Sequence, residues 1–119
     1  MKYQLLIIIG LLWIGSNTCM AQKKVAYEFP AAMKEPVRVE YEKLADKGQV
    51  LWNINCAKCH NTKVKGKVVV PDFLPEQLKG YELRVTNPQH ESDIPETTVT
   101  AEELGLIMTF LSYKKKNKL

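Results

Sequence analysis

The apolar residues of this 119-residue chain fall into runs with different spacing. The first run, Leu5 to Ile14, is almost continuous and follows Lys2. It has about half of the roughly 20 apolar residues that a membrane-spanning helix needs. Small and polar residues follow, ending in Ala21. We therefore predict that residues 1–21 are a secretory signal peptide that is cleaved after Ala21.

Two alternatives for this segment stay open. An uncleaved membrane anchor ranks second, because the apolar run is short for a span. Lipid attachment at Cys19 ranks third, because such signals favour Gly, Ala or Ser directly before the cysteine and this chain has Thr18. The signal peptide predicts an exported bacterial protein, periplasmic or otherwise extracytoplasmic, with no stable membrane span after cleavage.

The chain after residue 21 has the length of one small domain preceded by an arm. Residues 22–38 contain Pro30 and Pro36 and have no clear period, which predicts an extended N-terminal arm on the surface. Residues 39–55 carry apolar and small side chains at i, i+3, i+4 spacing, which predicts a helix. The residues of that face are Tyr41, Leu44, Gly48, Leu51, Trp52 and Asn55.

The middle of the chain is less periodic. Residues 61–73 form a basic stretch, and its three consecutive valines have no partner run, so we predict an extended loop. Pro75 suits the first position of a helix, which we place over 75–85. Asn87-Pro88 ends that helix. A polar loop follows over 87–99.

The last helix has the clearest local signals. Thr100 and Glu103 have the spacing of a capping box. The apolar residues that follow lie on one helical stripe: Leu104, Ile107, Met108 and Leu111. The lysines from Lys114 to Lys118 complement the negative end of the helix dipole. Together these patterns predict an all-α fold of about three helices with long loops and no sheet.

Charge and cysteine content limit the functions that this chain can have. The formal net charge of +4 is too small to argue for nucleic-acid binding. Of the three cysteines, Cys19 lies in the predicted signal, which leaves Cys56 and Cys59. In an oxidising compartment two spare thiols tend to pair or react. A group that consumes both thiols would leave none free.

Cys56-Ala57-Lys58-Cys59-His60 is a C-x-x-C-H motif, the attachment signature of a c-type haem. Two thiols can add across the two vinyl groups of haem, and the adjacent imidazole can bind the iron from the proximal side. Residues at i, i+3 and i+4 share one helix face. We therefore predict one haem c per chain, attached through Cys56 and Cys59, with His60 as the proximal iron ligand.

Two other chemistries fit the same residues. A zinc ion could be held by Cys56, Cys59, His60 and the second histidine of the chain, His90. A redox-active thiol pair is the other alternative, but such pairs usually lie beside a βαβ pattern, which this sequence lacks.

From about Leu44 to Tyr113 the chain resembles a small class I bacterial cytochrome c. Gly48, Trp52 and Cys56 match the spacing of that family's glycine, aromatic residue and first haem cysteine. Phe110 stands where the last helix of the family usually carries an aromatic residue. The resemblance implies that the glycine and the aromatic residue pack the first helix across the last one, and that residues 39–119 form a cytochrome c domain wrapped around the haem.

Pro71-Asp72-Phe73 resembles the family's Pro-x-Leu segment. The resemblance implies that the Pro71 carbonyl accepts the N–H of the His60 imidazole, a contact that fixes ring orientation.

The chain departs from the family at the distal iron ligand. A methionine usually precedes a proline in the loop before the last helix, and here Ile94 precedes Pro95. We predict His90 as the sixth ligand, because imidazole binds iron well and His90 lies in the same loop. An open or water-bound iron ranks next, and Met108 or Met33 last.

The function predicted from these features is electron transfer outside the cytoplasm, without catalysis. Lysines near the motif would steer redox partners with acidic surfaces. They are Lys58, Lys63, Lys65 and Lys67. The alternative is a haem protein with an open distal iron position, either a small-ligand sensor or a subunit of an exported oxidoreductase complex. A structural zinc module without a redox role is the third possibility.

Overall fold

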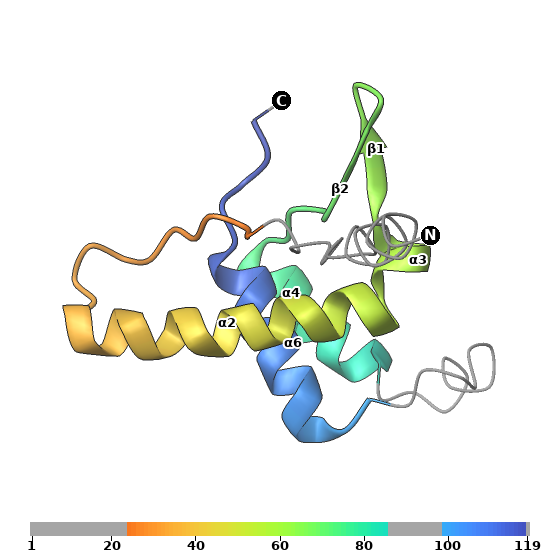
Figure 1. Ribbon diagram of the computed structural model, residues 1–119. Helices are drawn as coiled ribbons and strands as arrows, with labels where there is room; N and C mark the ends of the chain where they lie inside the picture. The colour runs from red at the N-terminus through yellow and green to blue at the C-terminus, as the bar shows by residue number, and fades with distance from the viewer. Residues whose placement is uncertain (1–23, 86–98, 119) are drawn as a thin grey trace, which may run out of the picture.

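The computed structural model describes residues 24–85 and 99–118, which form a small, mostly helical domain (Figure 1). The predicted signal peptide lies outside these residues. The described elements are α2 (Glu35–Asn55), α3 (Ala57–His60), β1 (Thr62–Val64), β2 (Lys67–Val69), α4 (Pro75–Val85) and α6 (Ala101–Tyr113). The mostly helical character that the sequence predicts is confirmed, but the prediction of no sheet is wrong, because β1 and β2 pair. No helix in the described ranges is long and apolar enough to cross a membrane.

Helix α2 begins at Glu35, four residues before the predicted start at 39 and inside the predicted arm. Pro36 occupies the first turn of the helix, where its missing N–H removes no hydrogen bond. Glu35 places a negative charge beside the positive end of the helix dipole. Pro36 therefore starts a helix here, and the prediction that the extended arm reaches residue 38 is wrong.

Helix α6 crosses α2 at Gly48 (Figure 1). A Cβ atom built on Gly48 would lie 2.0 Å from the carbonyl oxygen of Leu106 and 2.9 Å from the Cβ atom of Phe110. One turn further along α2, Trp52 is fully buried, as is Phe110 on α6. This is the helix crossing that the resemblance implied, with the glycine allowing the two backbones to approach closely.

The core lies beside this crossing. It is formed by Trp52, Leu78, Ile107, Phe110 and Leu111. The capping box predicted at the start of α6 is confirmed, since Thr100 N–H donates to Glu103 Oε2 (2.9 Å) and Glu103 N–H donates to Thr100 Oγ1 (3.2 Å). The predicted bounds of α4 are also confirmed.

Strands β1 and β2 form an antiparallel hairpin in which Thr62 pairs with Val69 and Val64 with Lys67. The two turn residues, Lys65 and Gly66, have φ angles of 48° and 78°. Positive φ at both central residues is the geometry of the tight turn that best matches strand twist. The prediction of an extended loop over these residues was therefore wrong. Strand β1, which pairs with the strand that contains the valines, was missed because it is short and contains a lysine, which is uncommon in strands.

The N-terminal arm and the C-terminal tail run antiparallel beside each other. Glu28 N–H donates to the Tyr113 carbonyl, and Lys115 N–H donates to the Ala26 carbonyl, both at 2.8 Å. Tyr27 and Lys114 form an isolated β-bridge between them. The arm is thus held by backbone pairing with the far end of the chain.

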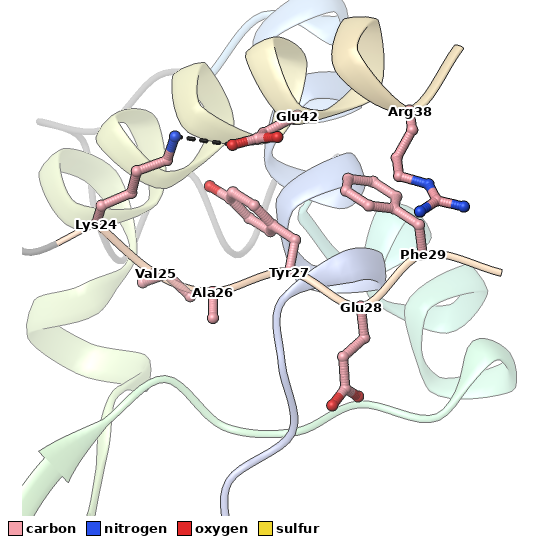
Figure 2. Close-up of a pocket in the computed structure, with 8 residues that line it drawn as sticks. All are labelled: Lys24, Val25, Ala26, Tyr27, Glu28, Phe29, Arg38 and Glu42. Carbon is pink, nitrogen blue, oxygen red and sulfur yellow. Dashed lines mark hydrogen bonds and ion pairs between the residues drawn. The ribbon is translucent and has the colours of Figure 1, made fainter. Parts of the chain in front are cut away.

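The same arm lies along α2 and forms a groove of about 690 Å³ with it (Figure 2). At one end of the groove, Lys24 Nζ lies 2.8 Å from Glu42 Oε1. The hydroxyl of Tyr27 donates to Asp46 Oδ1 at 2.8 Å. The arm is therefore fixed by side chains of α2 as well as by the tail.

The hydrogen bond between Tyr27 and Asp46 should make the stability of the protein depend on pH in the alkaline range. Burial of the Tyr27 ring and its hydrogen bond to Asp46 raise the pKa of the phenol above its usual value of 10.0. Above pH 10 the unfolded state therefore loses this proton before the folded state does, so stability falls as pH rises. We expect Tyr27→Phe to cost about 1 kcal/mol at pH 7 and to reduce the loss of stability above pH 10. Urea unfolding at pH 7, 9 and 11 measures both effects, and parallel curves for the two proteins would contradict the prediction.

Candidate haem site

The C-x-x-C-H motif lies directly after the last residue of α2. Cys56 N–H continues the helical pattern by donating to the Trp52 carbonyl at 2.8 Å. The Cys56 carbonyl then accepts from Cys59 N–H (3.2 Å) and His60 N–H (2.9 Å), which forms the short helix α3. The predicted helical spacing is therefore present, and it places Cys56, Cys59 and His60 on one turn.

The two cysteines differ in burial. Both are free thiols, with Cys56 half-buried against the core and Cys59 exposed. Burial raises the pKa of the Cys56 thiol to about 11, so this sulfur is a neutral thiol at physiological pH. Redox-active C-x-x-C pairs depend on a lowered thiol pKa. This finding weighs against the thiol-redox alternative.

The imidazole of His60 lies half-buried beside the core. Its ring centre is 6.1 Å from that of Trp52, with 48° between the planes. The Trp52 indole Nε1–H donates to Asn61 Oδ1 at 2.9 Å, so the residue after His60 is tied to the same ring. The burial of Trp52 and this hydrogen bond give His60 a rigid neighbour.

The segment containing Pro71 reaches the same neighbourhood. The Phe73 ring packs edge-on against Trp52, with 6.3 Å between ring centres. Pro71 is half-buried, and the residues on both sides of it, Val70 and Asp72, hydrogen-bond to the C-terminal tail. The predicted hydrogen bond from His60 to the Pro71 carbonyl stays a prediction.

The structure describes only some of the candidates for the distal iron ligand. His90 and Ile94 lie outside the described residues. Met108 is partly buried on α6 and packs against the core, as its apolar stripe predicted. It also lines a groove of about 460 Å³ between α4 and α6, together with Phe73 and Leu78.

Met33 is the least suitable candidate for an iron ligand. It precedes the first turn of α2, while Cys56 follows the last, and 21 helical residues separate them. At 1.5 Å per residue this is roughly 30 Å. The Met33 carbonyl also accepts a hydrogen bond from Arg38 Nη2 at 3.0 Å, which ties Met33 to the start of α2.

A zinc ion needs its donor atoms within about 2.3 Å of one point. Within residues 24–85 and 99–118, no group of three or more His, Cys, Asp and Glu side chains is placed to hold a metal ion. Cys56, Cys59 and His60 thus lie on one turn without converging. The fourth ligand of the zinc alternative, His90, lies outside the described residues.

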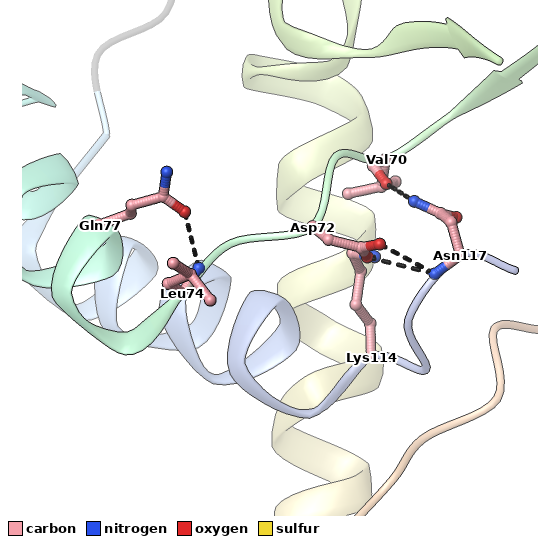
Figure 3. Close-up of polar contacts among 6 residues, drawn as sticks. All are labelled: Val70, Asp72, Leu74, Gln77, Lys114 and Asn117. Atoms are coloured by element: carbon pink, nitrogen blue, oxygen red, sulfur yellow. Dashed lines mark hydrogen bonds and ion pairs between the residues drawn. The ribbon is translucent and has the colours of Figure 1, made fainter. Parts of the chain in front are cut away.

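The structure also contains a polar cluster that the sequence analysis missed (Figure 3). Lys114, which we read as one of several lysines near the helix end, is buried and ion-paired with Asp72. Asn117 hydrogen-bonds to the same carboxylate. Asp72 is 42 positions from Lys114 and 45 from Asn117 in the chain, so no local pattern could have indicated the contact.

No family model, curated protein or solved structure matches this chain.

Proposed function

We propose that this protein is an exported monohaem cytochrome with a class I cytochrome c-like fold, which carries single electrons between redox partners. The observation that carries the proposal is the C-x-x-C-H motif on one helical turn at the end of α2. Cys56 lies against the core and His60 beside Trp52, so the motif borders the apolar interior where a haem would be shielded from water.

The residues of the motif have the chemistry that haem attachment requires. Both sulfurs are free to form thioethers, each adding its S–H across one vinyl group. The half-buried Cys56 and the exposed Cys59 would each hold one thioether, while His60 would bind the iron. When bound, haem supplies a one-electron iron couple. The protein would hold the His60 ring beside the buried Trp52, and Cys56 would anchor the haem against the core.

The helix crossing supports the class of fold. Gly48 and Phe110 make the close contact between first and last helix that the resemblance implied, and Trp52 and Cys56 follow Gly48 at intervals of four residues. The hairpin after the motif was not part of the expected pattern. It changes the loop that follows the proximal histidine, and it leaves the helix crossing intact.

The exposed lysines near the motif support docking to redox partners. Lys58 adjoins the exposed Cys59, and Lys63, Lys65 and Lys67 extend along the hairpin, all of them exposed. Positive charge beside the edge of the haem would speed encounter with partners that have acidic surfaces, and salt would screen the effect. The partners expected are redox proteins, with no role for nucleic acid.

A second function rests on one observation, the absence of methionine between His60 and the last helix. An iron without a strong sixth ligand would bind small molecules. The protein would then be a small-ligand sensor or a subunit of an exported oxidoreductase complex. The identity of the distal ligand separates the two functions.

Absorbance spectra of the wild type and of His90→Ala test the proposal. We expect a low-spin wild type, because two imidazoles bind the iron strongly, and a high-spin variant that binds carbon monoxide when reduced. His/His ligation should also place the potential below that of His/Met cytochromes. A wild type without haem absorbance would refute the function. Unchanged spectra in the variant would refute only the ligation by His90.

A further inference from the structure

The C-terminal tail holds the segment after the hairpin through polar contacts on both sides of Pro71 (Figure 3). Lys114 is ion-paired with Asp72. The backbone N–H of Asn117 donates to Asp72 Oδ2 at 3.0 Å, and its side-chain amide donates to the Val70 carbonyl at 2.8 Å. We refer to Asp72, Lys114 and Asn117 as the tail clamp.

The burial of the clamp indicates that it is more than a surface ion pair. The Lys114 side chain is 4% exposed, against 32% for Asp72. Lysine is almost never buried without a partner. A buried pair offsets the cost of desolvation only when its geometry is good, and separating the partners leaves an uncompensated buried charge. The clamp therefore fixes where residues 70–72 lie relative to α6.

A short series of contacts connects the clamp to the candidate iron ligand. Phe73 adjoins Asp72 and packs edge-on against Trp52, at 6.3 Å and 74°. Trp52 in turn lies 6.1 Å from the His60 ring and hydrogen-bonds to Asn61. A displacement of residues 70–73 would thus move Phe73 away from Trp52 and leave the ring beside His60 less shielded from water.

We propose that the tail clamp positions His60: by fixing residues 70–73 it keeps Phe73 against Trp52 and Trp52 against the imidazole. This inference rests on the proposed function, in which His60 binds the haem iron. Groups around a ligating histidine set the orientation of its ring and the access of water, and both tune the reduction potential. Asp72, Lys114 and Asn117 are therefore positioning residues for electron transfer.

The sharpest test is Asn117→Ala, because it removes the contact to the Val70 carbonyl without changing charge. We expect the one-electron reduction equilibrium to shift about threefold toward the oxidised form, since added water stabilises the more highly charged iron. The nuclear magnetic resonance signals of the Trp52 indole N–H and the His60 ring should move as well. Trp52 is readily assigned, because the other tryptophan of the chain, Trp13, lies in the predicted signal peptide.

Three lysine variants separate position from charge. Lys114→Met should shift the equilibrium in the same direction and by more than Lys118→Met, which removes the same charge from an exposed tail position. Lys114→Arg keeps the positive charge and should shift the equilibrium and the resonances less than Lys114→Met does. If Lys114→Met does not fold, the result for Asn117→Ala is sufficient to test the positioning role.

A purely structural clamp would give a different result. Asn117→Ala would then lower the melting temperature while the potential and the Trp52 and His60 resonances stay at wild-type values, and that outcome overturns the proposal. A wild type without haem would refute the proposed function instead. In that case unchanged resonances in the clamp variants would refute the positioning role, and shifted ones would support it.

Discussion

Replacing Cys56 and Cys59 together by alanine should abolish covalent haem and leave a colourless, poorly folded protein. The two thioethers are the expected covalent links, so no haem should remain with the chain. Cys56 also packs against the core, and the apolar haem would complete the interior that its thioether anchors. Haem staining after denaturing electrophoresis and acid-acetone extraction measure attachment, and circular dichroism measures the loss of helix.

The single variants and a neighbouring substitution provide the controls. Cys59→Ala removes the exposed anchor and should retain a haem held by one thioether, with a shifted absorbance maximum. Cys56→Ala should be more damaging, because it also removes a half-buried side chain. Lys58→Ala changes an exposed residue between the anchors and should keep full attachment. Haem that extracts freely from the wild type would refute covalent attachment.

Gly48→Ala should destabilise the protein by about 3 kcal/mol, at the upper end of what overpacking a core costs. The new methyl group would meet the Leu106 carbonyl oxygen at 2.0 Å and its carbon at 2.6 Å. Both are backbone atoms of α6, so a rotamer change cannot relieve the clash and the helices must separate. For a domain of this size the melting temperature should fall by roughly 12 to 24 °C.

Gly105→Ala is the matched control for this substitution. Gly105 also lies inside a helix, but a Cβ atom there meets nothing within 4 Å. Alanine should therefore stabilise α6 by about 0.5–1 kcal/mol through helix propensity alone. Thermal unfolding of both variants measures the difference. Similar melting temperatures would contradict the close helix crossing and, with it, the main support for the class of fold.

Much of the secondary structure could be predicted because its signals are local. The helix over 75–85 follows from Pro75 at its start, and the start of α6 follows from Thr100 and Glu103, which bond to each other within one turn. The helical turn that carries Cys56, Cys59 and His60 could be predicted for the same reason, and the haem that these residues would hold stays a prediction. His90 as the distal ligand stays a prediction.

The errors occurred where local signals were weak or ambiguous. Pro36 fits both an extended arm and the first turn of a helix, because in neither place does its missing N–H remove a hydrogen bond. The hairpin depends on a turn in which Lys65 has a positive φ angle, and lysine in a sequence does not indicate such a turn. Its partner strand is only three residues long, which is too short for a recognisable alternation.

The sequence by itself determined the elements that a few neighbouring residues specify: the capped last helix, the Pro75 helix and the C-x-x-C-H turn. Only the tertiary structure decided which distant segments meet. The arm pairs with the tail, and Lys114 is buried against Asp72 rather than solvated at a helix end. The physical reason is that burial and pairing depend on side chains and backbone groups brought together by the α2–α6 crossing, and a lysine in a basic run has the same local pattern whether it is buried or exposed.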